Sequence, residues 1–212
     1  MKLSGEDWEI RRENSVPSQT APPKCLLDFI DICKQSNVRR VADIGAGRLR
    51  STLPMLEAGL MVWAVDTPTQ LDRVADLTAQ TKRRYPNLRG PLTESDFAKS
   101  RLGLNGAVTV CVLHTIPESD IRAKLLDSIR RNTNPGGYVL IDVPHGEPYY
   151  SSLMTQDRRF RDGYVMGSGR LRTFYKEFAQ EELVRFVVGR GFTYQRDLRV
   201  RRHHSLLFTA RR

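Results

Sequence analysis

The sequence predicts a doubly wound α/β fold, and three observations carry this prediction. Short apolar segments such as residues 39–45 and 60–66 have the composition of strands that are buried on both faces of a parallel sheet. Segments with helical spacing separate them over most of residues 24–143, so strand and helix alternate as right-handed crossovers require. The last two apolar segments, 192–200 and 204–210, are too close for a crossover helix, and we expect them to pair as an antiparallel hairpin.

The predicted elements follow one another without an internal repeat. Residues 1–22 lack periodicity and end in Ala-Pro-Pro, so we expect an arm with little regular structure, followed by one domain over 23–212. One of the helices, 69–85, carries Leu71, Val74 and Leu77 on a single face. The sequence predicts helices over 24–36, 49–59, 69–85, 118–132 and 179–192, and strands over 39–45, 60–66, 106–114 and 137–143, with a weak strand within 89–97.

Composition bounds the class of protein. The chain has 212 residues, of which 40% are hydrophobic, as expected for a globular domain. No apolar segment approaches the ~20 residues of a membrane span, and the polar N-terminus lacks a signal-peptide segment, so we expect no membrane contact. Cys25, Cys33 and Cys111 have no metal-ligand spacing and are expected as small core residues, without a metal site, in the cytoplasm.

Positive charge concentrates in the last third of the chain. The net charge is +10, and residues 151–212 hold 14 Lys/Arg against 6 Asp/Glu, a balance of +8. This distribution favours an acidic substrate or a nucleic acid that meets the C-terminal part.

The segment VADIGAGRL, residues 41–49, reads as a buried strand that ends in a glycine turn. Gly45 and Gly47 are present, but Arg50 occupies the third glycine position of the dinucleotide fingerprint, and no phosphate-loop Gly-Lys-Ser/Thr follows. Asp43 lies two residues before the first glycine, where a carboxylate would repel a pyrophosphate and attract an ammonium. The turn therefore predicts a cofactor that is cationic at this end.

With these residues in place, the sequence over about residues 24–210 resembles the class I S-adenosylmethionine-dependent methyltransferases. The resemblance implies a Rossmann-like, doubly wound seven-stranded sheet with an antiparallel C-terminal hairpin, and S-adenosylmethionine as cofactor with S-adenosylhomocysteine as product. It also implies cofactor-binding roles by position: Asp43, Gly45 and Gly47 for the methionine part, Asp66 for the ribose, Thr67 beside the adenine, and Asp96 and Phe97 for the adenine amino group and ring. One departure is Leu49, where many members carry a small residue.

Two histidines follow predicted strands at the edge where ligands bind in open α/β sheets. His114 and His145 are therefore candidates for a catalytic base or for a group that orients the acceptor. We expect His203 and His204 at the surface in the hairpin turn, and Asp142 in a structural role. The residues Leu113 to Ile116 differ from the Asn/Asp-Pro-Pro-aromatic motif of base amino-methylases, which argues against exocyclic amines as acceptors.

The insert over residues 144–178 is the predicted acceptor-binding segment. Gly163, Gly167 and Gly169 would permit a mobile loop. Its candidate acceptor-binding residues are Tyr164, Arg170, Arg172, Phe174 and Tyr175, although Phe174 and Phe178 could instead pack the insert on the sheet. In the arm, Trp8, Arg11 and Arg12 could close over the cofactor.

The leading hypothesis is an enzyme of the EC 2.1.1 class that methylates a small or medium acceptor bearing a phosphate or carboxylate. Two alternatives stay open: a nucleic-acid methyltransferase that uses the basic C-terminal third, and a cofactor-binding scaffold subunit that has lost catalysis. An acidic small molecule is the favoured partner, and the sequence does not predict an oligomeric state.

Overall fold

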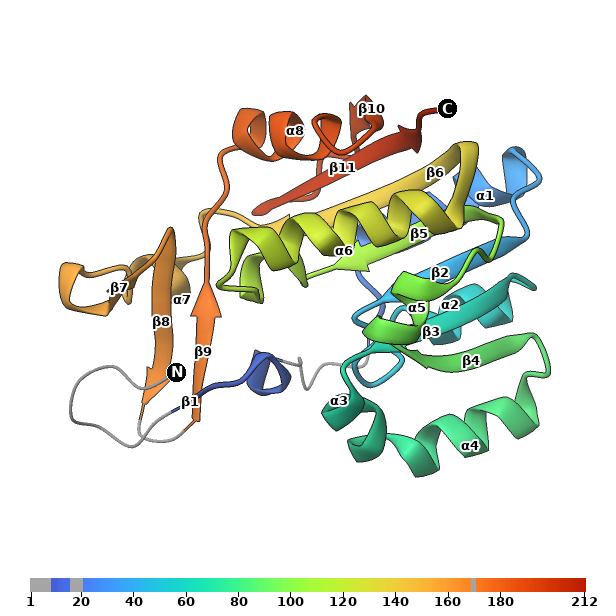
Figure 1. The fold of residues 1–212 in the computed structure, drawn as a ribbon, viewed down its shortest axis with the longest axis horizontal. Helices are drawn as coiled ribbons and strands as arrows, with labels where there is room; N and C mark the ends of the chain where they lie inside the picture. The colour runs from blue at the N-terminus through green and yellow to red at the C-terminus, as the bar shows by residue number, and fades with distance from the viewer. Residues whose placement is uncertain (1–8, 16–20, 169–170) are drawn as a thin grey trace.

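The computed structural model describes residues 9–15, 21–168 and 171–212, which form two sheets side by side (Figure 1). The larger sheet has seven strands in the order β10-β11-β6-β5-β2-β3-β4. Its strands are β2 (Arg40–Ile44), β3 (Met61–Asp66), β4 (Leu88–Thr93), β5 (Leu104–Val110), β6 (Thr133–Pro144), β10 (Phe192–Asp197) and β11 (His203–Ala210). Strands β4, β3, β2, β5 and β6 are parallel neighbours, whereas β11 pairs antiparallel with both β6 and β10. The predicted doubly wound sheet with an antiparallel C-terminal hairpin is confirmed.

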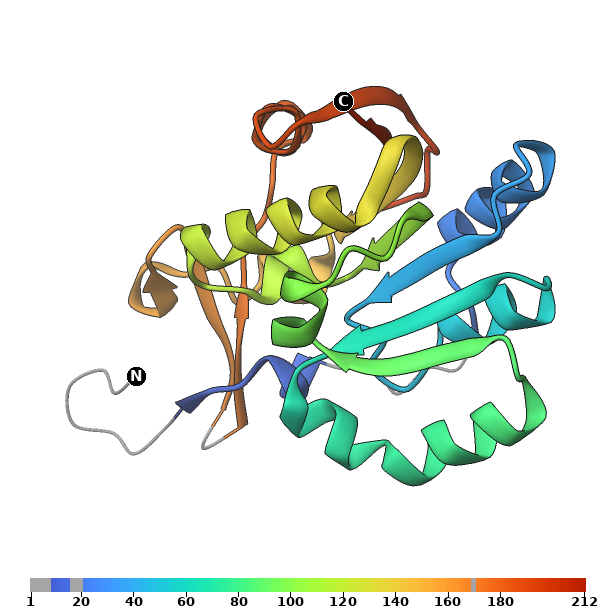
Figure 2. The same cartoon turned by 45° about the vertical axis from the view of Figure 1, so that its right-hand side comes forward.

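Helices cover both faces of this sheet (Figure 2), which explains why its central strands are almost wholly apolar. On one face α1 (Lys24–Gln35) and α2 (Thr52–Glu57) pack their buried side chains, such as Phe29 and Met55, against Val41 and Val108. On the other face, α5 (Glu94–Lys99), α6 (Ser119–Asn132) and α8 (Gln180–Val188) pack against Ile44 and Ile141. None of the helices among the described residues has the length and apolarity to cross a membrane.

The predicted single helix over 69–85 is wrong in one respect, because the chain forms two helices there. α3 (Pro68–Arg73) begins after Thr67, whose side chain accepts a hydrogen bond from the amide of Gln70. Val74 then leaves helical geometry, with φ −114° and ψ 16°, before α4 (Ala75–Arg84) begins. Val74 is nevertheless buried, as the spacing of Leu71, Val74 and Leu77 predicts, although the helix is interrupted there.

The smaller sheet is built from the arm and the insert. Its order is β1-β9-β8-β7, with β1 (Glu9–Ile10), β7 (Arg159–Phe160), β8 (Gly163–Ser168) and β9 (Leu171–Tyr175). α7 (Pro148–Ser151) and the short 3₁₀ helix η3 (Gln156–Arg158) precede it. The arm is therefore not devoid of regular structure, since β1 pairs in parallel with β9 and the 3₁₀ helix η1 (Arg12–Ser15) follows. A strand of two residues is too short to show periodicity in the sequence.

Gly163 lies within β8 and not in the predicted mobile loop. A Cβ atom at this position would lie 2.4 Å from the carbonyl oxygen of Tyr175 and 2.5 Å from the ring of Phe174. The glycine is required because two strands and an aromatic ring approach closely, and not because the chain must move.

Candidate active site

A first cavity lies at the carboxyl ends of β2, β3 and β5. It is lined by the glycine turn, by the end of β3, by the segment after β5 and by the arm, including Gly45, Gly47, Asp66, Thr67, Cys111 and Val112. Its volume is about 70 Å³. This is smaller than the about 300–1,000 Å³ that is usual for pockets of drug-sized ligands, and residues of the arm form part of its lining.

The glycine turn presents backbone to this cavity. Gly45 has φ 73°, and a Cβ atom there would lie 2.3 Å from a methyl carbon of Val112. Gly47 has φ 56°, again in the region that disfavours a side chain. Leu49 also adopts a left-handed conformation, with φ 63°, and its side chain is buried in the core. Its size therefore does not obstruct the cavity, although the small residue common at this position is missing.

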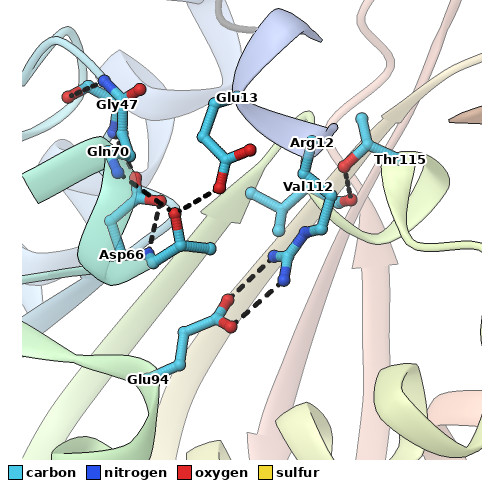
Figure 3. A network of polar contacts seen from close by, with 9 residues as sticks. Arg12, Glu13, Gly47, Asp66, Gln70, Glu94, Val112 and Thr115 are labelled. Atoms are coloured by element: carbon cyan, nitrogen blue, oxygen red, sulfur yellow. Dashed lines mark hydrogen bonds and ion pairs between the residues drawn. The ribbon is translucent and has the colours of Figure 1, made fainter. Parts of the chain in front are cut away.

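Asp66, the last residue of β3, joins the turn to the next helix. One carboxylate oxygen accepts a hydrogen bond from the amide of Gly47 at 2.7 Å, and the other accepts from the amide of Thr67 at 2.7 Å (Figure 3). Burial raises the pKa of Asp66, while these two amides act against that rise. Thr67 lines the cavity beside Asp66 and donates its hydroxyl hydrogen to Glu13 at 2.6 Å.

Asp43 lies behind the turn and does not line the cavity. It is fully buried, and its carboxylate accepts a hydrogen bond from the hydroxyl of Thr52 at 2.6 Å. Burial raises its pKa to about 7. In this structure Asp43 braces the turn from within, and it reaches a ligand only through the backbone that it supports.

Asp96 and Phe97 also lie outside the cavity lining. Asp96 is exposed and forms the N-terminal cap of α5 with Thr93, whereas Phe97 is buried in the main core. The acidic residue nearest to the cavity on this side is Glu94, which binds both terminal nitrogens of Arg12 at 2.8 and 3.1 Å. Sequence spacing could not separate Glu94 from Asp96 because they lie on the same short helix.

Arg12, Glu13 and Ser15 of the arm line the first cavity. Figure 3 shows Arg12 and Glu13 on the side of Asp66 and Glu94. Arg12 pairs with Glu94 and Glu13 with Thr67, so both contacts hold η1 against the cofactor side. Arg11 instead pairs with Glu9 at the surface. Trp8 lies outside the described residues.

A second, larger cavity of about 620 Å³ adjoins the first, and Ser15, Arg50 and Cys111 line both. Its other walls come from α1, from the segment after β5, from the end of β6, from α7 and from the terminal hairpin. They include Lys24, His114, Asp142, Glu147, Tyr149, Tyr150, Arg201 and His203. The two cavities thus meet near Cys111, which has the uncommon φ of 58° for a residue that is not glycine.

The two predicted histidines have different surroundings. His114 is buried in the second cavity, with its ring edge-on to Tyr150 and Tyr175 at 6.4 and 5.6 Å between centroids. Its Nδ1 has no hydrogen-bond partner among the described residues, and burial lowers its pKa to about 3. His145 lines neither cavity; its ring lies 4.2 Å from that of His204.

The predicted acceptor residues are dispersed. Tyr175 is buried and stacks on Tyr150 at 3.9 Å, so it supports the aromatic wall from behind. Phe174 packs in the core of the smaller sheet. Tyr164 lies on β8, opposite Tyr175 of β9, and Arg172 lies on β9 where this strand pairs with β1. Arg170 falls outside the described residues. The basic side chains that line the second cavity are instead Lys24, Arg50 and Arg201.

Sequence reasoning missed a polar cluster at the end of β6. His203 is not in the hairpin turn, as predicted, but is the first residue of β11, and its Nδ1 lies 2.9 Å from Oδ2 of Asp142. Ser205 donates to the other oxygen of Asp142, and the thiol of Cys111 lies 3.6 Å from Oδ2. The register places Ser205 opposite Asp142 and His203 two residues away, so an antiparallel alignment of the last strand would have revealed the cluster.

The same cluster brings a thiol, a carboxylate and an imidazole within 4.8 Å of one another, a spacing that could suit a metal ion. Hydrogen bonds already join these groups, and the positive charge of Arg50 lines the same cavity and opposes a cation. We therefore interpret it as a hydrogen-bonded cluster.

No known family of sequences matches this chain, and no curated protein is similar to it in sequence. Solved structures do resemble it. A 1,6-didemethyltoxoflavin-N1-methyltransferase from Burkholderia thailandensis, with 1,6-didemethyltoxoflavin and S-adenosylhomocysteine bound, aligns with a TM-score of 0.66 and 21% identity over 89% of this chain and 79% of its own.

Two further structures extend the comparison. An S-adenosylmethionine-dependent methyltransferase from Clostridium acetobutylicum aligns with a TM-score of 0.66 and 15% identity over 89% of this chain and 92% of its own. A magnesium protoporphyrin IX methyltransferase from Synechocystis, with S-adenosylhomocysteine bound, aligns with a TM-score of 0.60 and 16% identity over 87% of this chain and 81% of its own. With its sheet order and the cavity at the carboxyl ends of its strands, the chain has the fold of the class I S-adenosylmethionine-dependent methyltransferases.

Proposed function

We propose that this protein is a methyltransferase of the EC 2.1.1 class that binds S-adenosylmethionine in the first cavity and the methyl acceptor in the second. The observation that carries the proposal is the junction of the two cavities at Ser15, Arg50 and Cys111. Methyl transfer needs the donor and the acceptor in line and shielded from water, and proximity supplies most of its acceleration.

The residues of the first cavity fit this cofactor. Gly45 and Gly47 leave backbone where a Cβ atom would intrude, which suits the close approach of the methionine part. Each oxygen of Asp66 accepts one amide hydrogen and retains a lone pair for a ribose hydroxyl, with Thr67 alongside. When bound, S-adenosylmethionine supplies a methyl group that its sulfonium already activates for transfer.

The lining of the second cavity supports an acidic acceptor of small or medium size. Both of its acidic residues already have partners, since Asp142 binds His203 and Glu147 pairs with Arg202 at 3.7 Å. The positive charges of Lys24, Arg50 and Arg201 therefore dominate the lining. Ser15 Oγ and His114 Nδ1 are buried there without a hydrogen-bond partner among the described residues, which favours a polar ligand. Tyr149 and Tyr150 add two aromatic rings to the lining, in edge contact with each other at 5.4 Å between centroids.

Calorimetry with S-adenosylmethionine and S-adenosylhomocysteine tests the cofactor half of the proposal. We expect at least one to bind in the micromolar range. A dissociation constant of ~1 mM corresponds to a binding free energy of about −4 kcal/mol. If neither ligand binds at that concentration, the cofactor half of the proposal is contradicted.

A labelled-methyl assay tests the acceptor half. Cell extract is divided into nucleic acid, protein and metabolites, and each fraction is incubated with the protein and methyl-labelled S-adenosylmethionine. We expect label in the metabolite fraction. Label in nucleic acid alone, with affinity that falls steeply as salt rises, would favour the alternative that uses the basic C-terminal third. Cofactor binding without transfer to any fraction would favour the scaffold alternative.

A further inference from the structure

The carboxylate of Asp142 and the imidazole of His203 form a pair on the wall of the second cavity. Asp142 is 1% exposed at its side chain, and both of its oxygens accept hydrogen bonds, from His203 and from Ser205. These bonds keep the pKa of Asp142 below its ordinary value against the effect of burial, so the group is an ionised acceptor at neutral pH.

The ionised carboxylate fixes the tautomer of the ring. A carboxylate accepts hydrogen bonds and cannot donate one, so Nδ1 of His203 carries the hydrogen that Asp142 accepts. In the neutral imidazole the lone pair then lies on Nε2. His203 is partly exposed, with 25% of its side chain accessible, and lines the cavity that we assign to the acceptor. A base with this tautomer is therefore available where the acceptor would bind.

We propose that His203 is the general base that takes the proton of the methyl acceptor, and that Asp142 is the positioning residue that orients it. This inference rests on the proposed function and narrows its substrate class to acceptors that hold a proton at neutral pH, such as a hydroxyl, a thiol or a ring N–H. Amines that are already unprotonated, and carboxylates, need no such base.

The step balances in atoms and charge. The proton of the acceptor passes to Nε2 of His203, and the electron pair released on the acceptor atom forms its bond to the methyl carbon. The bond between that carbon and sulfur breaks with its pair kept by sulfur, which becomes neutral. The positive charge then resides on the imidazolium, stabilised by Asp142, until the proton passes to water.

His114 and His145, the two histidines predicted from the sequence, are less suited than His203 to act as the general base. His114 shares the cavity, but its burial makes it too weak a base at neutral pH, so it is better suited to hydrogen-bond the ligand. His145 lines neither cavity.

Charged and titratable groups from several elements share the cavity with His203, and Asp142 on β6, Glu147 before α7 and Arg50 after the glycine turn act on it most directly. The others are Cys111 and His114 after β5, Lys24 on α1, Tyr149 and Tyr150 on α7, and Arg201 before β11. The hydrogen bond and charge of Asp142 prevail over burial and Arg50, so the pKa of His203 lies above its ordinary value. Since the neutral ring is the base, transfer is expected to rise as pH increases through that raised pKa.

Nuclear magnetic resonance of the imidazole nitrogens tests the pair without any acceptor. The chain has 4 histidines, so a full-length sample labelled in histidine gives a simple spectrum in which His203→Asn identifies the signal. We expect Nδ1 of His203 to carry the hydrogen in the neutral form, and its pKa to fall on Asp142→Asn. An Nε2–H tautomer, or a pKa that Asp142→Asn leaves unchanged, would overturn the inference.

Label transfer to the extract metabolites tests catalysis. General bases usually contribute about 10²–10⁴-fold, so His203→Asn is expected to lower transfer at least about 100-fold near pH 7 without weakening S-adenosylhomocysteine binding. Asn can still donate to Asp142, and the loss should shrink at high pH as the acceptor ionises unaided. Asp142→Asn should move the rising limb of the profile to lower pH.

His204→Asn is the matched control, because His204 is adjacent, lines neither cavity and contacts the ring of His145. We expect it to retain transfer. Three outcomes would each overturn the role of His203: equal loss in both variants, an unchanged pH profile in Asp142→Asn, or transfer abolished by a metal chelator. Two outcomes with the wild-type chain would instead contradict the proposed function: failure to bind either nucleoside, or cofactor binding with no transfer at any pH.

Discussion

The two cavities are built in different ways although they share a wall. The first draws most of its lining from one stretch, the glycine turn and the end of β3, within residues 45–67. The second gathers side chains from α1, the ends of β5 and β6, α7 and the terminal hairpin, which lie far apart in sequence. A site encoded locally can be recognised from spacing, whereas a site assembled by long-range pairing becomes visible only when the strands are aligned.

The largest expected effect concerns Asp66. Asp66→Ala removes the carboxylate that is proposed to bind the ribose hydroxyls in the first cavity. Hydrogen bonds to charged groups contribute about 1.5–3 kcal/mol, so affinity for S-adenosylhomocysteine should fall about 10- to 100-fold by calorimetry. Asp96→Ala is the matched variant and should change affinity less than about twofold, because Asp96 caps α5 outside the cavity. An equal loss in Asp96→Ala would show that Asp96 binds the adenine, as the sequence resemblance implies.

Gly163→Ala tests the packing of the smaller sheet, outside both cavities. The added methyl meets the backbone of Tyr175 and the ring of Phe174, so the free energy of unfolding should fall by about 1–3 kcal/mol in a denaturant titration. Gly189→Ala is the control, because Gly189 has φ −62° and its nearest neighbouring atom would lie 3.3 Å from the new Cβ. Equal stability of Gly163→Ala and wild type would mean that this part of the sheet is loosely packed.

Asp43, behind the glycine turn, and His114, in the second cavity, should change the free energy of unfolding in opposite directions with pH. Asp43 keeps its proton in the folded state up to about pH 7, whereas the unfolded group loses it above 3.8, so its contribution to stability falls as pH rises between these values. His114 stays neutral down to about pH 3, whereas the unfolded ring is protonated below 6.5, so its contribution falls as pH decreases.

Denaturant titrations at several pH values separate these contributions. Relative to wild type, Asp43→Asn should gain stability as pH rises toward 7, and His114→Gln should gain it as pH falls below 6.5, each by at most about 1.4 kcal/mol per pH unit. Parallel curves for wild type and either variant would show that the burial of that group is incomplete in solution.

The smallest expected effect is that of the arm. Arg12→Ala removes a partly buried ion pair with Glu94, an interaction of about 0.2–1 kcal/mol, and should speed association of S-adenosylhomocysteine by up to about fivefold in stopped-flow experiments. Glu94→Gln should act in the same direction. Slower binding in Arg12→Ala but not in Glu94→Gln would indicate that Arg12 contacts the ligand itself.

The difference between the cavities also explains what the sequence could predict. Apolar strands, helix spacing and the short terminal connection were sufficient for the sheet and its antiparallel hairpin. The glycine turn and Asp66, which line the first cavity, could be predicted because their order along the chain is itself the signal. His203 was misplaced because its contact with Asp142 depends on the register between β11 and β6. Lys24 gave no signal, and Arg201 entered only through the charge excess of the last third. The arginines and aromatics of the insert drew attention by composition, but Phe174 serves the packing of the smaller sheet.

Ser15 lies on the arm and lines both cavities, which has a kinetic consequence. Because Ser15 belongs to η1, any movement of η1 would change the lining of both cavities at once. A ligand already seated in the second cavity would hinder that movement. Under the proposed function, this shared contact predicts an ordered scheme in which the nucleoside enters first and leaves last.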